Sequence, residues 1–403
     1  MRKRTEKRRW IRYVLWLLLL VTVGVGVIMI DTWSALGKRP GGERLAQIQN
    51  SPQYAGNKFV NPLPPRNPEF LRVMRRWFFE ETPDKEPVTP VPLNQIKPAF
   101  FDATPPDLRI TWFGHSSFLV ELDGQRILVD PVWGDHASPG RIFGVKRFHA
   151  PPISLENLPA IDAVVLSHDH YDHLNEPTIK RLKDIVPLFV VPLGLGAHLE
   201  YWGVSPEKIR ELDWWGEVAV GNMRLVCTPA RHFSGRSLTD RDATLWAGWA
   251  FVGTEHRAYY SGDTGMFPGF QEIGDRLGPF DITLMETGAY NSDWVDVHMG
   301  PEQAVAAHQM VRGNLLVPVH WGTFALAFHS WTEPVERVLA AAKNVGIEVA
   351  TPRPGDSIVP TAVPQDKWWP AVPWKTAKET PIISTRLSDE IVARIRALQD
   401  EMP

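Results

Sequence analysis

The stretch Ser167-His168-Asp169-His170-Tyr171-Asp172-His173-Leu174 places three imidazoles and two carboxylates within six residues. It follows Ile161–Leu166, a short apolar run rich in β-branched residues that predicts a buried strand, so the histidines fall on the loop at its carboxyl end. A polar loop with solvent-exposed histidines is the alternative. Burying this many titratable groups without a metal ion costs free energy, so the stretch favours a metal site.

The spacing of this loop offers two separate sets of ligands. His168 and His170 form one set, and Asp172 and His173 form the other. Neutral imidazole and carboxylate are ligands that suit zinc and its borderline neighbours. The pattern therefore predicts two metal ions.

Three more polar residues lie at or just past the ends of apolar runs that predict strands: His232, Asp263 and His320. Side chains at strand ends can meet above a sheet. Each residue alone is more typical of an ordinary core or loop position. Together with the loop they make seven ligands, which gives each of two metals three terminal ligands and one shared carboxylate, with room for a bridging water.

These residues resemble the metallo-β-lactamase superfamily of binuclear metallohydrolases, through the His168-x-His170-x-Asp172-His173 loop, His232, the turn Ser261–Gly265 and His320. Within it the chain is similar to the N-acyl-phosphatidylethanolamine phospholipase D family. That narrower resemblance rests on four segments: Lys58–Pro62, Thr111–Ser117, His298–Ala304 and His320–Leu326.

The resemblance implies an α/β fold, the αβ/βα sandwich, and two zinc ions. It assigns His168, His170 and His232 to one zinc, assigns Asp172, His173 and His320 to the other, and makes Asp263 the bridge. The expected catalytic residues are Asp172, Asp263 and His298.

The roles of four further residues stay open or are expected to be indirect. His298 either stabilises charge on the substrate phosphate, as the resemblance implies, or caps a helix that begins near Pro301. Asp169 is a structural residue, a support for a ligand or a general acid. We expect Asp130 to bond a ligand imidazole and His115 to line the site.

The amino terminus predicts a membrane anchor. Residues 1–12 are strongly basic and form a cytoplasmic tail, whereas residues 13–30 carry no charge and form a transmembrane segment. About 18 to 20 apolar residues suffice to cross a bilayer. Because the cleavage site after residue 31 is poor, we expect a retained anchor, with the catalytic domain on the extracytoplasmic side, periplasmic in a Gram-negative bacterium.

Composition divides the remaining chain into three parts. Residues 31–105, rich in Pro, Gly, Asn and Arg, predict an extended arm with one amphipathic helix near residues 70–80, which packs on the catalytic domain or lies on a membrane. Residues 106–360 form the catalytic domain, and residues 361–403 a tail with a terminal helix. The net charge of −3 gives no indication of nucleic-acid binding.

The expected function is a zinc-dependent phosphodiesterase that hydrolyses membrane phospholipid and, by the resemblance, releases phosphatidic acid and an N-acylethanolamine. The expected partners are the phospholipid substrate and the bilayer. One alternative is a hydrolase of another ester, a lactone or an amide. Another is a membrane-tethered binding protein with a structural metal. The sequence carries no signal for an oligomeric state or for zinc over iron or manganese.

Overall fold

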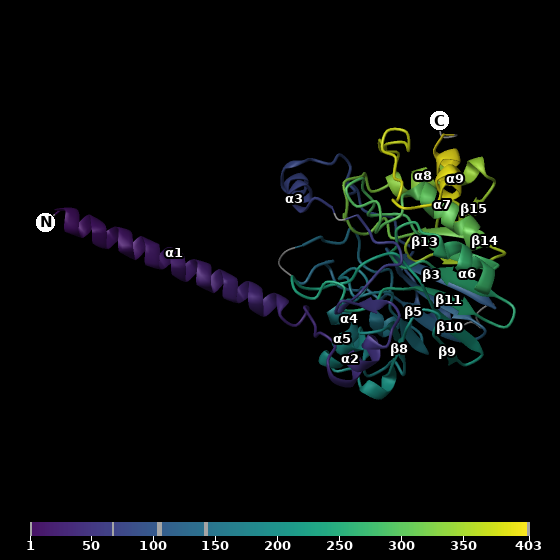
Figure 1. The fold of residues 1–403 in the computed structure, drawn as a ribbon, viewed down its shortest axis with the longest axis horizontal. Coiled ribbons are helices and arrows are strands. Elements are labelled where there is room, and N and C mark those ends of the chain that lie inside the picture. Colours follow the sequence, from purple (N-terminus) through teal and green to yellow (C-terminus); the bar gives the residue numbers. More distant parts are fainter. Residues whose placement is uncertain (1, 67, 103–106, 141–143, 401–403) are drawn as a thin grey trace.

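Two β-sheets form the centre of the computed structural model, which describes residues 2–66, 68–102, 107–140 and 144–400 (Figure 1). The first sheet has the order β16 (Ser357–Ile358), β3 (Leu108–Gly114), β4 (Ser117–Leu122), β5 (Gln125–Val129), β6 (Ala163–Val165), β7 (Phe189–Pro192) and β8 (Ile209–Leu212). The second has the order β15 (Glu348–Val349), β14 (Gly313–Val319), β13 (Phe280–Glu286), β12 (Arg257–Tyr260), β11 (Gly248–Val252), β10 (Met223–Thr228) and β9 (Glu217–Val220).

The hydrophobic core lies between the two sheets. Ile110, Val120 and Ile127 from the first sheet share one buried cluster with Leu225 and Leu284 from the second. The two sheets are held together by this apolar contact, which is the main favourable term in folding. The Asp123-Gly124 pair closes the β4–β5 hairpin with positive φ at both residues, as its sequence predicts.

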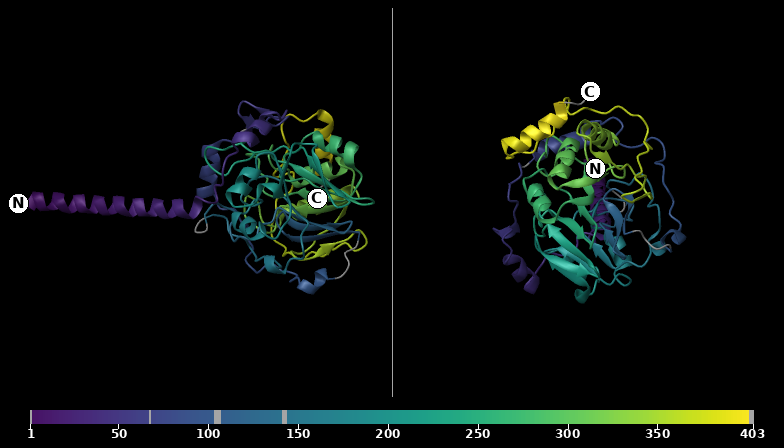
Figure 2. Two further views of the ribbon diagram at one scale, coloured as in Figure 1. Left: turned by 90° about the horizontal axis from the view of Figure 1, so that it is seen from below. Right: turned by 90° about the vertical axis from the view of Figure 1, so that its right-hand side faces the viewer.

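Helices cover the outer face of each sheet. A second apolar cluster lies against the second sheet and includes residues of α6 (Gly269–Leu277), α7 (Pro301–Met310), α8 (Glu333–Asn344) and α9 (Asp389–Asp400). A third lies against the first sheet and includes residues of α4 (Glu176–Leu182) and α5 (Gly196–Tyr201). The layers are helix, sheet, sheet, helix, so the expected αβ/βα sandwich is confirmed (Figure 2).

The arm contains more regular structure than its composition indicates. It holds α2 (Gly42–Gln49), the small hairpin β1 (Tyr54–Ala55) and β2 (Lys58–Phe59), α3 (Phe70–Phe79) and the short 3₁₀ helix Pro98–Phe101. Arg44 pairs with Glu200 at 2.8 Å and also contacts Glu211, which ties α2 to the domain. The expected boundary between residues 105 and 106 lies outside the described residues.

The tail after the second sheet returns to the domain. Trp368 and Trp369 are buried, and Trp368 stacks on Trp321 with ring centroids 5.3 Å apart. The pair clamps the tail onto the domain, and α9 ends the described chain.

Helix α1 (Arg2–Thr32) leaves the domain as a single long rod (Figure 1). Among the described residues it is the one helix long and apolar enough to cross a membrane, over Arg9–Thr32. The chain that follows is fixed to the domain. Trp202 Nε1 donates to the Ser34 carbonyl at 2.8 Å, and the Lys38 backbone N–H donates to His198 Nδ1 at 3.0 Å.

Candidate metal centre

The polar residues expected to gather do so at one edge of the sandwich. Strand β10 is antiparallel to β11, which is antiparallel to β12, so β10, β12 and β14 all run in one direction. Their carboxyl ends carry His232, Asp263 and His320. The loop after β6 meets them from the other sheet. It runs into α4, whose N-cap Asn175 accepts a hydrogen bond from the Thr178 N–H at 3.2 Å.

His168, His170 and His232 form the first group. Nδ1 of His170 lies 2.8 Å from Nε2 of His168 and 3.2 Å from Nε2 of His232. Zinc with Zn–N bonds of about 2.0–2.1 Å separates tetrahedral ligand atoms by about 3.4 Å, so the three nitrogens can surround one ion. The Val297 carbonyl accepts from His232 Nδ1 at 2.7 Å, which directs the lone pair on Nε2 into the group.

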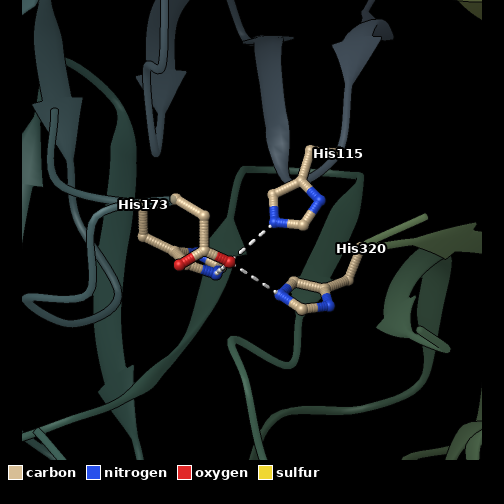
Figure 3. Close-up of side chains that lie close together, drawn as sticks. His115, His173 and His320 are labelled. Carbon is tan, nitrogen blue, oxygen red and sulfur yellow. Dashed lines mark hydrogen bonds and ion pairs between the residues drawn. The ribbon is translucent and has the colours of Figure 1, made fainter. Parts of the chain in front are cut away.

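Asp172, His173 and His320 form the second group, and His115 joins them. Oδ2 of Asp172 lies 2.9 Å from Nε2 of His115, 3.4 Å from Nε2 of His173 and 3.2 Å from Nε2 of His320 (Figure 3). His115 comes from the β3–β4 turn and is buried. The expectation that it lines the site is met, and it contacts the same carboxylate oxygen as the two expected ligands.

Asp263 lies between the two groups. Its Oδ2 is 3.0 Å from His320 Nε2 and 3.1 Å from His173 Nε2. The same oxygen is 3.8 Å from His168 Nε2 and 3.9 Å from His232 Nε2. A carboxylate in this position can contact an ion in either group.

The arrangement of His173 and Asp263 suits binding of a metal ion better than a hydrogen bond between the two side chains. Asp130 Oδ2 accepts from His173 Nδ1 at 2.8 Å, so a neutral His173 presents the lone pair of Nε2 to the oxygen of Asp263 unless a proton or a metal ion lies between them. Nε2 of His173 and Oδ1 of Asp263 are buried without a hydrogen-bond partner. Facing lone pairs repel unless a cation lies between them, and buried polar atoms are rarely left without a partner. Asp130 thus has the orienting role that the sequence predicts for it.

The electrostatics of the second group also favour a cation. Burial opposes ionisation of Asp263, but His173 and His320 outweigh it and hold the pKa of this carboxyl well below its usual range. Burial would lower the pKa of His320, yet the charges of Asp263 and Asp172 raise it to about 10. The two carboxylates therefore draw positive charge into this group, either as protons or as a metal ion.

Unusual backbone geometry positions several of these side chains. His115, Asp130 and His320 have φ values of 52°, 38° and 65°, in the left-handed region that non-glycine residues rarely adopt. Gly262, before Asp263, has φ 60°, and a Cβ there would lie 2.4 Å from the Ala247 carbonyl oxygen. Such conformations persist where the surrounding structure fixes them, and they cluster at functional sites.

Asp169 points away from both groups. Its Oδ1 accepts from the Gly235 N–H at 2.8 Å, and its Oδ2 accepts from the Thr244 hydroxyl at 2.9 Å and lies 3.6 Å from His198 Nε2. Of the three roles open to it, the contacts favour the structural one. Its hydrogen bonds connect the loop of residues 234–244 to the loop that follows β6.

His298 is held by a carboxylate that sequence reasoning missed. Its Nδ1 lies 3.0 Å from Oε2 of Glu286, the last residue of β13, and Oε1 of Glu286 accepts from the Met299 N–H at 2.6 Å. The N-cap of α7 is Gly300, so the expectation that His298 could cap this helix is wrong. The bond to Glu286 leaves Nε2 of His298 available to a ligand. An acidic residue directly after the run Ile282–Met285 was the signal for Glu286 in the sequence.

A cavity of about 260 Å³ opens onto the centre. Asp172, Asp263, His170, His298 and His320 contribute its polar floor. Its rim carries two arginines and several apolar side chains: Pro65, Arg66, Pro68, Phe233, Arg241, Trp294 and Leu326. The site can therefore hold a molecule with an anionic part and an apolar part.

Comparison with known proteins agrees with this architecture. Residues 125–321 match the family model described as "Beta-lactamase superfamily domain". A solved isothiocyanate hydrolase from Delia radicum gut bacteria superimposes with a TM-score of 0.50 at 21% identity, over 62% of this chain and 98% of that one. This similarity in structure supports the assignment of the αβ/βα sandwich fold. The chain belongs to the β-lactamase superfamily and is a metal-dependent hydrolase.

Two relatives refine this placement. An uncharacterised protein of Mycobacterium tuberculosis is 46% identical over 369 residues, which cover 87% of this chain and 98% of the relative. The N-acyl-phosphatidylethanolamine-hydrolyzing phospholipase D 1 of Caenorhabditis elegans is 38% identical over 272 residues, 64% of this chain and 76% of that protein. Within the superfamily, this chain is thus a homologue of phospholipases of that kind.

Proposed function

We propose that the chain is a binuclear zinc phosphodiesterase that hydrolyses membrane phospholipid, with an N-acyl-phosphatidylethanolamine as substrate and phosphatidic acid and an N-acylethanolamine as products. The homology to the nematode phospholipase D supports the substrate class. The cavity, which joins a cationic rim to the metal groups, is the observation that carries the proposal.

The proposed ligands follow the two groups described above. His168, His170 and His232 would hold one ion, and Asp172, His173 and His320 the other, with Asp263 shared between them. Bound zinc ions supply a hydroxide from water near neutral pH and polarise a phosphoryl oxygen. With five neutral imidazoles and two carboxylates as ligands, two zinc ions would keep a net positive charge, which suits an anionic phosphodiester.

Residues of the chain would position the substrate around these ions. The side chain of His298 lines the cavity floor, and its bond to Glu286 fixes the plane of the ring. Burial raises the pKa of the Glu286 carboxyl, so a protonated Oε2 can donate to His298 Nδ1. The ring proton of His298 is then on Nε2, where it can be donated to a phosphate oxygen or given to the departing alkoxide. Arg66 and Arg241 at the rim offer further donors to the phosphate, and Trp294 and Leu326 offer apolar surface to lipid chains.

The test is a product assay with the full-length protein in phospholipid vesicles. Vesicles that contain N-acyl-phosphatidylethanolamine should yield phosphatidic acid and N-acylethanolamine by mass spectrometry, with about two zinc ions per chain by elemental analysis. A matched panel of lactones and carboxylic esters tests the alternative, in which the same metal-activated water attacks a carbonyl carbon. Lactone turnover without phosphodiester turnover would refute the phospholipase assignment.

The proposed location is a membrane, with the catalytic domain on the extracytoplasmic side. The basic residues before Tyr13 support a cytoplasmic amino terminus, since positively charged flanks stay inside. A phosphatase reporter, active only outside the cytoplasm, should be active when fused to the carboxyl terminus. An inactive phosphatase fusion, together with an active cytoplasmic reporter at the same position, would reverse the topology.

A further inference from the structure

Helix α3 carries four of its apolar side chains on the outside. Phe70, Leu71, Phe78 and Phe79 are 70%, 82%, 69% and 84% exposed. They lie on one half of the helix, since positions three, four, seven and eight residues apart share a face. No residue of α3 is buried.

The opposite half of α3 faces the domain and holds Arg72 and Arg76 beside Trp77, whose ring centroid lies 5.7 Å from that of Phe328. Arg76 Nη1 lies 2.6 Å from Asp293 Oδ2 and donates to Asn291 Oδ1 at 2.9 Å, and Arg72 Nε lies 3.2 Å from Asp293 Oδ1. The Arg76 guanidinium also lies 4.3 Å from the centre of the Phe328 ring. A surface helix of a water-soluble protein buries its main apolar stripe on the core and keeps its charges in water. Helix α3 instead pairs two arginines with the domain and leaves a phenylalanine and a leucine at its start and two phenylalanines at its end in water. The exposed phenylalanines of α3 therefore need a partner of low polarity.

The position of α3 identifies that partner. Helix α3 lies on the side of the domain from which α1 emerges, at some distance from the carboxyl-terminal end of α1 (Figure 1). The candidate span Arg9–Thr32 has 24 residues, which rise about 36 Å, slightly more than the roughly 30 Å of a hydrocarbon core. The end of α1 therefore reaches the outer surface of the bilayer that it would cross.

The chain between α1 and the domain keeps this geometry. Ala35 is buried, and its carbonyl accepts from Arg236 Nε at 2.8 Å. Ser34 and Lys38 are also hydrogen bonded to the domain. Because the anchor is attached without a free linker, it would hold the domain, and α3 with it, at a fixed height above the membrane that α1 would cross.

The cavity opens beside the same helix. Pro65, Arg66 and Pro68, which line it, immediately precede α3 in sequence, and Trp294, another lining residue, follows Asp293, which holds the arginines of α3. Arg75, exposed on the apolar half, lies one turn from Leu71 and Phe79, where a guanidinium can reach lipid phosphates while its stem lies along the apolar surface.

We propose that α3 is a membrane-docking helix, which inserts Phe70, Leu71, Phe78 and Phe79 into the outer leaflet of the bilayer that α1 spans and so presents the cavity to that leaflet. The occupant of this surface is phospholipid. The inference extends the proposed function, because it states how a membrane substrate reaches the site, but the docking itself requires no particular reaction.

The test measures the depth of α3 in a bilayer with the full-length protein. The native Cys227 is buried, so a cysteine introduced at Leu71→Cys or Phe78→Cys takes a nitroxide label selectively. Val345→Cys, at the 40% exposed residue that follows α8, is the matched control, because β15 and α8 lie on the side of the domain away from α1 (Figure 1). The labelled proteins are reconstituted in phosphatidylcholine vesicles that contain phosphatidylglycerol.

The readout compares collisions of the label with oxygen, which concentrates in lipid, and with a water-soluble nickel complex. At residues 71 and 78 the oxygen-to-nickel ratio should exceed that at residue 345 several-fold. Equal ratios at all three positions would overturn the proposal. Labels at 71 and 78 that neither reagent reaches would also overturn it, since a protein surface, such as a second copy, would then cover α3. No substrate is present, so failure here and failure of the lipid assay are separate results.

Discussion

The metal centre and helix α3 both reverse the usual distribution of side chains, in opposite senses. In the centre, carboxylates and imidazoles such as Asp263 and His173 are buried. In α3, phenylalanines and a leucine point outward. Buried polar groups and exposed apolar groups each cost free energy in an isolated soluble chain, so each arrangement indicates a partner absent from the chain itself. The comparison teaches that the centre needs cations and α3 needs an apolar surface.

Asp263→Ala should have the largest effect. Because Asp263 lies within 4 Å of ligands in both groups, its loss should abolish measurable hydrolysis and release one or both metal ions. Elemental analysis and a turnover assay on the same sample check this. Full metal content and activity in a folded variant would remove Asp263 from the centre.

His298→Ala should be less severe. His298 faces the cavity and bonds Glu286, so it should act on substrate and not hold an ion. Turnover should fall by about 10²-fold, the low end for a positioned acid, base or charge-stabilising group, while the metal content stays unchanged. Loss of metal from this variant would place His298 among the ligands, where its 3.9 Å distance from Asp263 Oδ2 would permit it to act.

Glu286→Leu should lower turnover by roughly tenfold, since supporting hydrogen bonds typically contribute that much to a site. The expected defect is a freely rotating His298, so Glu286→Gln, which still offers an amide to His298 Nδ1, should recover part of the activity. The double variant with His298→Ala should be no slower than His298→Ala alone. A further loss in the double variant would show that Glu286 acts on the metal ligands instead.

The smallest effect on stability belongs to α3. Phe78→Ser and Leu71→Ser should each change the free energy of unfolding by less than about 0.5 kcal/mol in detergent, because these side chains are mostly exposed. Leu284→Ala, in the core between the sheets, is the contrast and should cost about 2–5 kcal/mol. Denaturant titrations of the three variants measure these changes in the free energy of unfolding. A large loss at residue 78 would mean that α3 packs on the domain through its apolar half.

The sequence predicted what depends on local pattern. The strand before the metal loop, the Asp123-Gly124 hairpin and the convergence of His168, His232 and Asp263 all follow from periodicity, turn chemistry and strand ends. The contacts of Glu286 and Asp169 could not be predicted, because they join separate elements of the fold: Glu286 contacts His298, and Asp169 contacts Gly235 and Thr244. The orientation of α3 on the domain could not be predicted from the sequence either. A helical pattern identifies two faces, and only the fold decides that the arginine face meets Asp293.

The attachment of residues 34–38 to the domain also has a kinetic consequence. A protein on a flexible tether samples many heights and tilts above a membrane. In the proposed arrangement this domain would keep lateral diffusion and rotation about the bilayer normal, and lose the other motions. Encounter with substrate then becomes a two-dimensional process, in which the rate follows the mole fraction of lipid substrate in the leaflet and is insensitive to the bulk concentration of vesicles.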